Sequence, residues 1–185
     1  MFYLIIVTLA IIIALLRGGD LERLFEISIK SVYLFAIALG LRILIWVIAG
    51  LNISAIVNYI GYFSVLSYLF LLYASFTNIK IDGFKYIILG LSLNSFVILI
   101  NGGKMPVLLS EKTVEQIDIE TLFNNGKNAI HLIKNENTMF TFLGDIFQLP
   151  KPFPDTSILS VGDIIIIVGL FVLIQKIMIN DEIPS

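Results

Sequence analysis

The chain lacks cysteine and contains a single histidine. The absence of cysteine excludes disulfides, thiolate metal sites and cysteine nucleophiles. His131 has no second histidine or cysteine that could complete a transition-metal shell, so we expect no metal site and interpret His131 as a loop residue. No GxSxG element and no phosphate-binding glycine loop of GxxxxGK[ST] or GxGxxG spacing is present. We therefore assign no catalytic residue and expect no cofactor.

Charge is also scarce, because charged residues make up only 14% of the chain. Twelve Lys and Arg against fourteen Asp and Glu leave a net charge of -2. This balance provides no basic surface of the kind that neutralises phosphates, so nucleic acid is not an expected partner.

Apolar residues, in contrast, are unusually abundant. They form 58% of the 185 residues, and the mean hydropathy is +0.97. Ordinary soluble domains are roughly 45–50% apolar. The composition predicts an integral membrane protein whose main partner is the lipid bilayer, built as one membrane domain over residues 1–185.

Five apolar stretches predict an all-helical architecture with five transmembrane helices. In lipid only a helix satisfies its own backbone donors and acceptors, and a span of about 20 residues crosses the hydrocarbon core. Asn52 and Ile53 barely separate the second and third stretches, which predicts a tight hairpin. The predicted spans cover residues 2–16, 32–51, 54–76, 86–100 and 163–179.

Positive charges in the short loops predict an orientation in the cytoplasmic (inner) membrane. Arg and Lys in short loops favour the cytoplasmic side. Placing them there puts the N-terminus outside, the C-terminus in the cytoplasm and the polar block 101–162 outside. The loop and terminal cations concerned are Arg17, Arg23, Lys30, Lys80, Lys85 and Lys176.

The polar block itself predicts a short helix over residues 113–123, because Thr113 can act as a cap with Gln116 three residues later. Residues 149–154 contain three prolines at alternate positions and predict a stiff, non-helical connector.

Two polar features fall inside the predicted spans. Arg42 is the one charge within the second span, where it is either a structural anchor that reaches a helix end or a functional group paired with Asp145, Asp163 or a bound anion. Asn94 and Asn101 share one face of the fourth span with Gly90, which favours hydrogen bonding between helices.

The string Asn101-Gly102-Gly103-Lys104-Met105-Pro106-Val107 closes the fourth span. Two consecutive glycines predict a Schellman-type helix end followed by a turn. A re-entrant or ligand-binding loop that uses Lys104 is the alternative interpretation.

Two Gly-Asp pairs, ending at Asp145 and Asp163, stand where helices could start. Ser160 followed three residues later by Asp163 is typical of a helix cap that satisfies unpaired amide groups. A catalytic pair of aspartates is the alternative, but Ser160 stands where an intramembrane aspartyl protease would have glycine.

Taken together, the NGGKMPV string, the Leu143-Gly144-Asp145 segment with Leu149-Pro150, and Ser160-Val161-Gly162-Asp163 resemble a family of small bacterial multi-pass membrane proteins that is defined only as a domain of unknown function. The resemblance extends to Gly19–Leu24 and so spans nearly the whole chain. It implies a multi-pass architecture and a bacterial origin, and no activity.

Three functions remain open on these grounds. The first is a non-enzymatic accessory or interaction subunit that associates with a membrane protein partner or with itself. The second is binding or transport of a small molecule, lipid or ion in a polar intramembrane pocket, and the third is an intramembrane hydrolase. The candidate pocket residues are Arg42, Asn94, Asn101, Gly102, Gly103, Lys104, Asp145 and Asp163.

Overall fold

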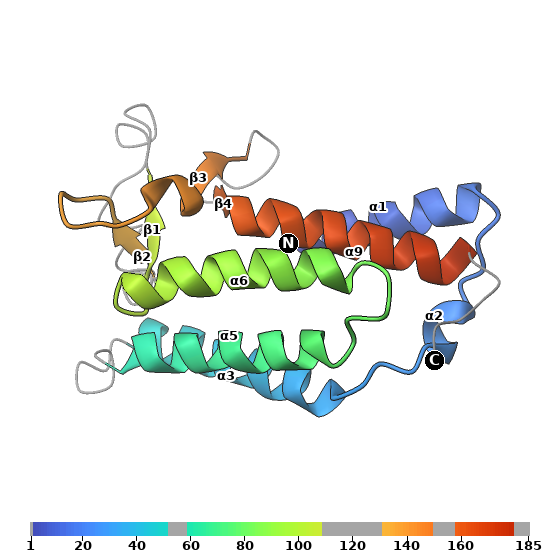
Figure 1. The fold of residues 1–185 in the computed structure, drawn as a ribbon, viewed down its shortest axis with the longest axis horizontal. Coiled ribbons are helices and arrows are strands. Elements are labelled where there is room, and N and C mark those ends of the chain that lie inside the picture. Colours follow the sequence, from blue (N-terminus) through green and yellow to red (C-terminus); the bar gives the residue numbers. More distant parts are fainter. Residues whose placement is uncertain (1, 52–58, 109–130, 150–157, 180–185) are drawn as a thin grey trace.

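The computed structural model describes residues 2–51, 59–108, 131–149 and 158–179. Five long helices lie roughly side by side, and a small sheet covers one end of them (Figure 1). A one-turn helix, α2, lies at the opposite end. The helices are α1 (Phe2–Leu16), α2 (Arg23–Glu26), α3 (Val32–Gly50), α5 (Ile60–Phe76), α6 (Phe84–Ile100) and α9 (Val161–Ile179).

Each of the five apolar stretches forms a helix, as predicted. The α1 helix has the predicted bounds, whereas α6 and α9 each begin two residues earlier than expected. The predicted hairpin at Asn52 and the predicted helix over 113–123 lie outside the described residues. So does most of the proline-rich connector.

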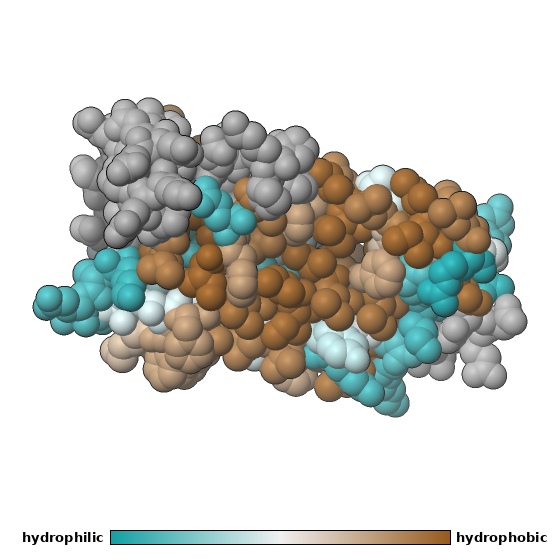
Figure 2. All heavy atoms as spheres, turned by 90° about the horizontal axis from the view of Figure 1, so that it is seen from above, coloured by the Kyte–Doolittle hydropathy of each residue, from teal (hydrophilic) through white to brown (hydrophobic). Residues whose placement is uncertain are grey.

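Among the described helices, α9 alone is long and apolar enough to cross a membrane by length and composition. The other four long helices are apolar but offer shorter described stretches. Large apolar side chains are nevertheless exposed along the length of the helices, and polar residues gather toward the two ends (Figure 2).

The helices pack in the order α1, α9, α6, α5, α3, so that α1 and α3 form the two edges of a curved row. The crossing of α6 with α9 is especially close, because Gly90 and Gly162 face each other there. A Cβ atom on Gly90 would meet the carbonyl oxygen of Gly162, and one on Gly162 would meet the side chain of Asn94. Only glycine therefore lets the two backbones approach this closely.

The end of α6 confirms the predicted Schellman turn. Gly102 adopts a positive φ of 68°, its N–H donates to Leu99, and the Gly103 N–H donates to Ile98 over 2.8 Å. These bonds satisfy carbonyl groups that a helix end leaves without partners. The turn directs the chain from α6 into the first strand.

The sheet is the main departure from the predicted all-helical architecture. Its strands follow the order β2-β1-β3-β4, with β1 parallel to both neighbours and β3 antiparallel to β4. The strands have three or four residues, too few for an alternating pattern to be visible in the sequence. They are β1 (Met105–Val107), β2 (His131–Ile133), β3 (Asp145–Gln148) and β4 (Ile158–Ser160), with a 3-10 turn at Thr141–Leu143.

Two predictions for the polar block were wrong because this part of the chain forms the sheet. His131 is not a loop residue, because it lies in β2 and pairs with Met105 of β1. Asp145 does not start a helix, because it is the first residue of β3. In both cases the partner strand is distant in sequence, so local patterns could not reveal it.

Candidate functional site

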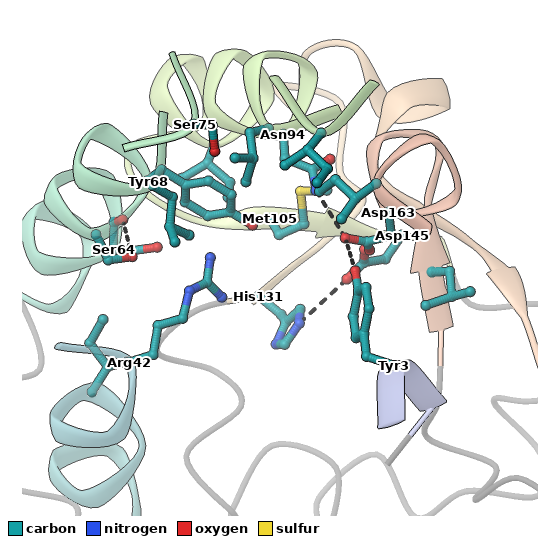
Figure 3. Close-up of a pocket in the computed structure, with 18 of the residues that line it drawn as sticks. Tyr3, Arg42, Ser64, Tyr68, Ser75, Asn94, Met105, His131, Asp145 and Asp163 are labelled. Carbon is teal, nitrogen blue, oxygen red and sulfur yellow. Dashed lines mark hydrogen bonds and ion pairs between the residues drawn. The ribbon is translucent and has the colours of Figure 1, made fainter. Parts of the chain in front are cut away.

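A cavity of about 730 Å³ lies within the curve of the helix row, beneath the sheet (Figure 3). All five long helices contribute to its walls, together with strands β1 to β4. Most of the wall is apolar, with polar side chains interspersed. The polar lining residues are Tyr3, Arg42, Ser64, Ser67, Tyr68, Ser75, Asn94, His131, Asp145 and Asp163.

Asp163 anchors one wall of the cavity as part of a helix cap. The Ser160 Oγ accepts a hydrogen bond from the Asp163 N–H over 2.9 Å, and Asp163 Oδ2 accepts one from the Ser160 N–H over 3.0 Å. This reciprocal pair satisfies two backbone donors at the start of α9. The capping interpretation of Ser160 and Asp163 is therefore confirmed.

The same carboxylate connects three helices. Its Oδ1 accepts hydrogen bonds from the Tyr3 hydroxyl of α1 over 2.8 Å and from Asn94 Nδ2 of α6 over 3.0 Å. The Oδ1 of Asn94 in turn accepts from the Ser160 hydroxyl over 2.9 Å. Because Asn94 and Ser160 are both fully buried, these bonds hold α6 against the start of α9, as predicted for Asn94.

A second carboxylate reaches the cavity from the sheet. Asp145 is buried, and its Oδ2 lies 3.4 Å from Nε2 of His131 on β2. Burial raises the pKa of the Asp145 carboxyl above its ordinary value, although the bond to His131 opposes part of this effect. The nearby charge of Asp163 acts in the same direction as burial.

Arg42 projects into the cavity from α3, on the side opposite Asp163 (Figure 3). Its guanidinium carbon lies 4.5 Å from the centre of the Tyr68 ring, a cation–π arrangement. In the part of the chain that the structure describes, no carboxylate lies within ion-pair distance of Arg42. The predicted pairing of Arg42 with Asp145 or Asp163 is thus not formed as a direct contact.

Ser75 contributes an unusual polar atom to the wall. Its side chain is fully buried, and its Oγ has no hydrogen-bond partner among the described residues. Other helical hydroxyls, such as those of Ser67 and Ser95, bond to a carbonyl of the preceding turn. A buried hydroxyl without a partner is uncommon, because losing its hydrogen bonds to water is costly.

Four of the eight candidate pocket residues line this cavity, namely Arg42, Asn94, Asp145 and Asp163. The other four lie at the end of α6, outside the cavity lining. There the side chain of Asn101 donates to the Met139 carbonyl and accepts from the Met139 N–H, both at 3.0 Å. Gly102 and Gly103 form the helix-ending turn, and Lys104 leads into β1.

Six polar residues of the cavity lining were not among the candidates, namely Tyr3, Ser64, Ser67, Tyr68, Ser75 and His131. Tyrosine and serine are common in apolar helices, so their type carried no signal. Tyr68 does lie on the same face of α5 as Ser64 and Ser75, because the three residues are four and seven positions apart. This polar helix face was a usable indication of a polar site. His131 had no local signal, because its place depends on the pairing of β1 with β2.

Comparison with known proteins gives a relative but no structural match. An uncharacterised protein of Thermotoga maritima is 29% identical over 164 residues, which cover 89% of this chain and 84% of that protein. No solved structure matches. A family model described as a family of unknown function, DUF5317, matches residues 26–175. The predicted membership of an uncharacterised family is confirmed, and the chain belongs to the DUF5317 family.

Proposed function

We propose that this protein is a multi-pass membrane protein that binds a small amphipathic molecule in the cavity enclosed by its helices. The observation that carries the proposal is the cavity itself. Its volume of about 730 Å³ falls in the range of small-molecule sites, and an apolar wall with a few converging polar groups is typical of them.

The apolar exterior supports the membrane part of the proposal. Leu4, Leu16, Trp46 and Tyr62 each expose more than two thirds of their surface, and they belong to three different helices. Water would disfavour so much exposed apolar surface, whereas hydrocarbon would not. At a rise of about 1.5 Å per residue, helices of 15–19 residues are roughly 22–28 Å long, so five spans require a slightly thinned bilayer or extension into flanking residues.

The placement of charge supports the predicted orientation. The loops after α1 and α5 and the last turn of α9 lie at the end of the helix row opposite the sheet (Figure 1). Together with the first turn of α6, which holds Lys85, these segments carry the six cations, and this favours a cytoplasmic location for that end. The N-terminus and the sheet would then face the outside of the inner membrane.

Orientation is tested by cysteine labelling, because the natural chain has no cysteine. Asn137 is exposed at the sheet end and Asp82 is exposed at the opposite end. In intact cells an impermeant thiol reagent should label Asn137→Cys and not Asp82→Cys. Labelling of both variants only after the cells are broken would contradict the proposed orientation.

Ligand binding is tested with the neutral amphiphile monoolein and purified, delipidated protein in detergent. Binding should raise the melting temperature and change the fluorescence of Trp46, the chain's single tryptophan, which lines the cavity. Ser75→Leu should fill the cavity and abolish both signals. Ser95→Leu, on α6 away from the cavity lining, should leave them unchanged. No saturable response in the natural protein would refute the proposal.

One observation favours the interaction-subunit function as a second candidate. Ala36 and Gly40 are exposed on α3, and a Cβ atom on Gly40 would meet no atom within 4 Å. Small residues spaced by four allow another helix to approach closely. Gly40→Leu should then disrupt a complex captured by crosslinking in membranes, whereas it should leave monoolein binding intact.

A further inference from the structure

Building on the proposed function, we infer that the cavity selects an acidic amphiphile, with Arg42 holding a carboxylate or phosphate head group and the apolar wall holding its hydrocarbon chain. Three observations support this: the balance of charges inside the cavity, the exposed aromatic residues that the edge helices contribute to its lining, and an unpartnered polar atom in its wall.

The carboxylates of the cavity already have partners. Asp163 accepts hydrogen bonds from Tyr3, Asn94 and the Ser160 backbone, and Asp145 is bonded to His131. Neither carboxylate therefore requires a cationic ligand. A cation from the ligand would also have to displace contacts that anchor α9.

Arg42 differs, since its guanidinium has no carboxylate within ion-pair distance among the described residues. The guanidinium carbon lies 4.5 Å from the centre of the Tyr68 ring. The N–H donors of a guanidinium lie in one plane and form a fork that matches a carboxylate or phosphate. Figure 3 shows the guanidinium directed into the cavity, where an anion would complete its coordination.

The two edge helices suit a ligand that arrives from the bilayer. The helix row ends at α1 and α3, and each edge helix contributes aromatic residues to the lining. Tyr3 of α1 and Trp46 of α3 are both exposed as well as lining the cavity. Trp46 lies one turn beyond Arg42 on α3, so an exposed aromatic side chain and the guanidinium line the cavity from the same edge helix.

The apolar wall and Ser75 indicate the chemistry of the part of the ligand beyond its head group. Ser75 lies seven residues beyond Tyr68 on α5, about 10 Å farther from the sheet along the helix. Between them the wall includes Phe35, Leu71 and Leu91, which suit a hydrocarbon chain. The unpartnered Ser75 hydroxyl offers a hydrogen bond within this apolar region.

The test compares amphiphiles that share a chain and differ in charge. Oleate, oleoyl lysophosphatidate and neutral monoolein are titrated into the delipidated protein, with inorganic phosphate as the chain-free anion. Both acidic amphiphiles should bind about tenfold or more tightly than monoolein, because a charge-assisted bidentate contact is stronger than a neutral one. Phosphate alone should not stabilise the protein measurably.

Arg42→Gln should remove the preference for acid and leave monoolein affinity within about twofold, which also shows that the variant is folded. Arg42→Lys should keep part of the preference, because its charge remains without the fork. Arg17→Gln is the matched control at the opposite end of the molecule. It removes a hydrogen bond to Gln175 but should leave the affinity for each amphiphile unchanged. Equal binding of the acidic and neutral amphiphiles, or an unchanged preference in Arg42→Gln, would overturn this inference while the proposed function stands. Failure of every amphiphile to bind would overturn both.

Discussion

The contact between Ser160 and Asn94 provides a sharp test of how α6 and α9 are held together. Ser160→Ala removes a helix cap, which costs about 1 kcal/mol. It also leaves the buried Oδ1 of Asn94 without its donor, which costs roughly 1–3 kcal/mol more. We therefore expect Ser160→Ala to lower the free energy of unfolding by about 2–4 kcal/mol.

Asn94→Ala removes the other partner of the same contact. It deletes the donor to Asp163 and leaves the Ser160 hydroxyl without its acceptor. Each single variant leaves unpaired a polar group that the other substitution removes. The double variant should therefore lose about 1–2 kcal/mol less free energy of unfolding than the two single variants lose in sum. Unfolding is measured by denaturant titration in detergent micelles, and the four proteins form a double-mutant cycle.

Ser75→Ala is the matched control for Ser160→Ala. Both serines are fully buried, but Ser75 Oγ has no hydrogen-bond partner among the described residues. Its removal without added ligand should be neutral or stabilising by about 1 kcal/mol. Costs of Ser160→Ala and Asn94→Ala that add within about 0.5 kcal/mol would refute the argument that the two side chains act as one unit.

Two further predictions concern the sheet and the helix crossing. Because burial raises the pKa of Asp145, the folded state holds that proton more tightly than the unfolded chain, and stability falls as the pH rises through the folded pKa. Asp145→Asn should therefore melt at a higher temperature than the natural protein at neutral pH, and this difference in melting temperature should disappear below about pH 4. A difference that persists below about pH 4 would contradict the predicted direction of the pH dependence. The new side chain of Gly162→Val should collide with Asn94 and lower the free energy of unfolding by about 1–3 kcal/mol or more. Gly40→Ala, whose added methyl group meets no neighbour, should be tolerated. Similar losses of unfolding free energy in both variants would argue against the close crossing of α6 and α9.

Much of the helical layout could be predicted because the relevant forces act locally. A long apolar stretch that must satisfy its own backbone can only form a helix in lipid, and this reasoning located all five long helices. The Gly102-Gly103 turn and the Ser160-Asp163 cap were also predictable, since each depends on residues within one helical turn. Asn94 was recognised from its place on the Gly90 face of α6.

The sheet and the cavity depended on contacts between residues far apart in sequence. Met105 pairs with His131, and Val107 pairs with Asp145, so neither strand pairing leaves a local pattern. The separation of Arg42 from both aspartates likewise depends on the order of the helices in the row. Composition and helix-end chemistry thus determined the helices and their caps, whereas the tertiary structure decided which polar side chains share a cavity, because helix order and strand pairing are set by packing between distant segments.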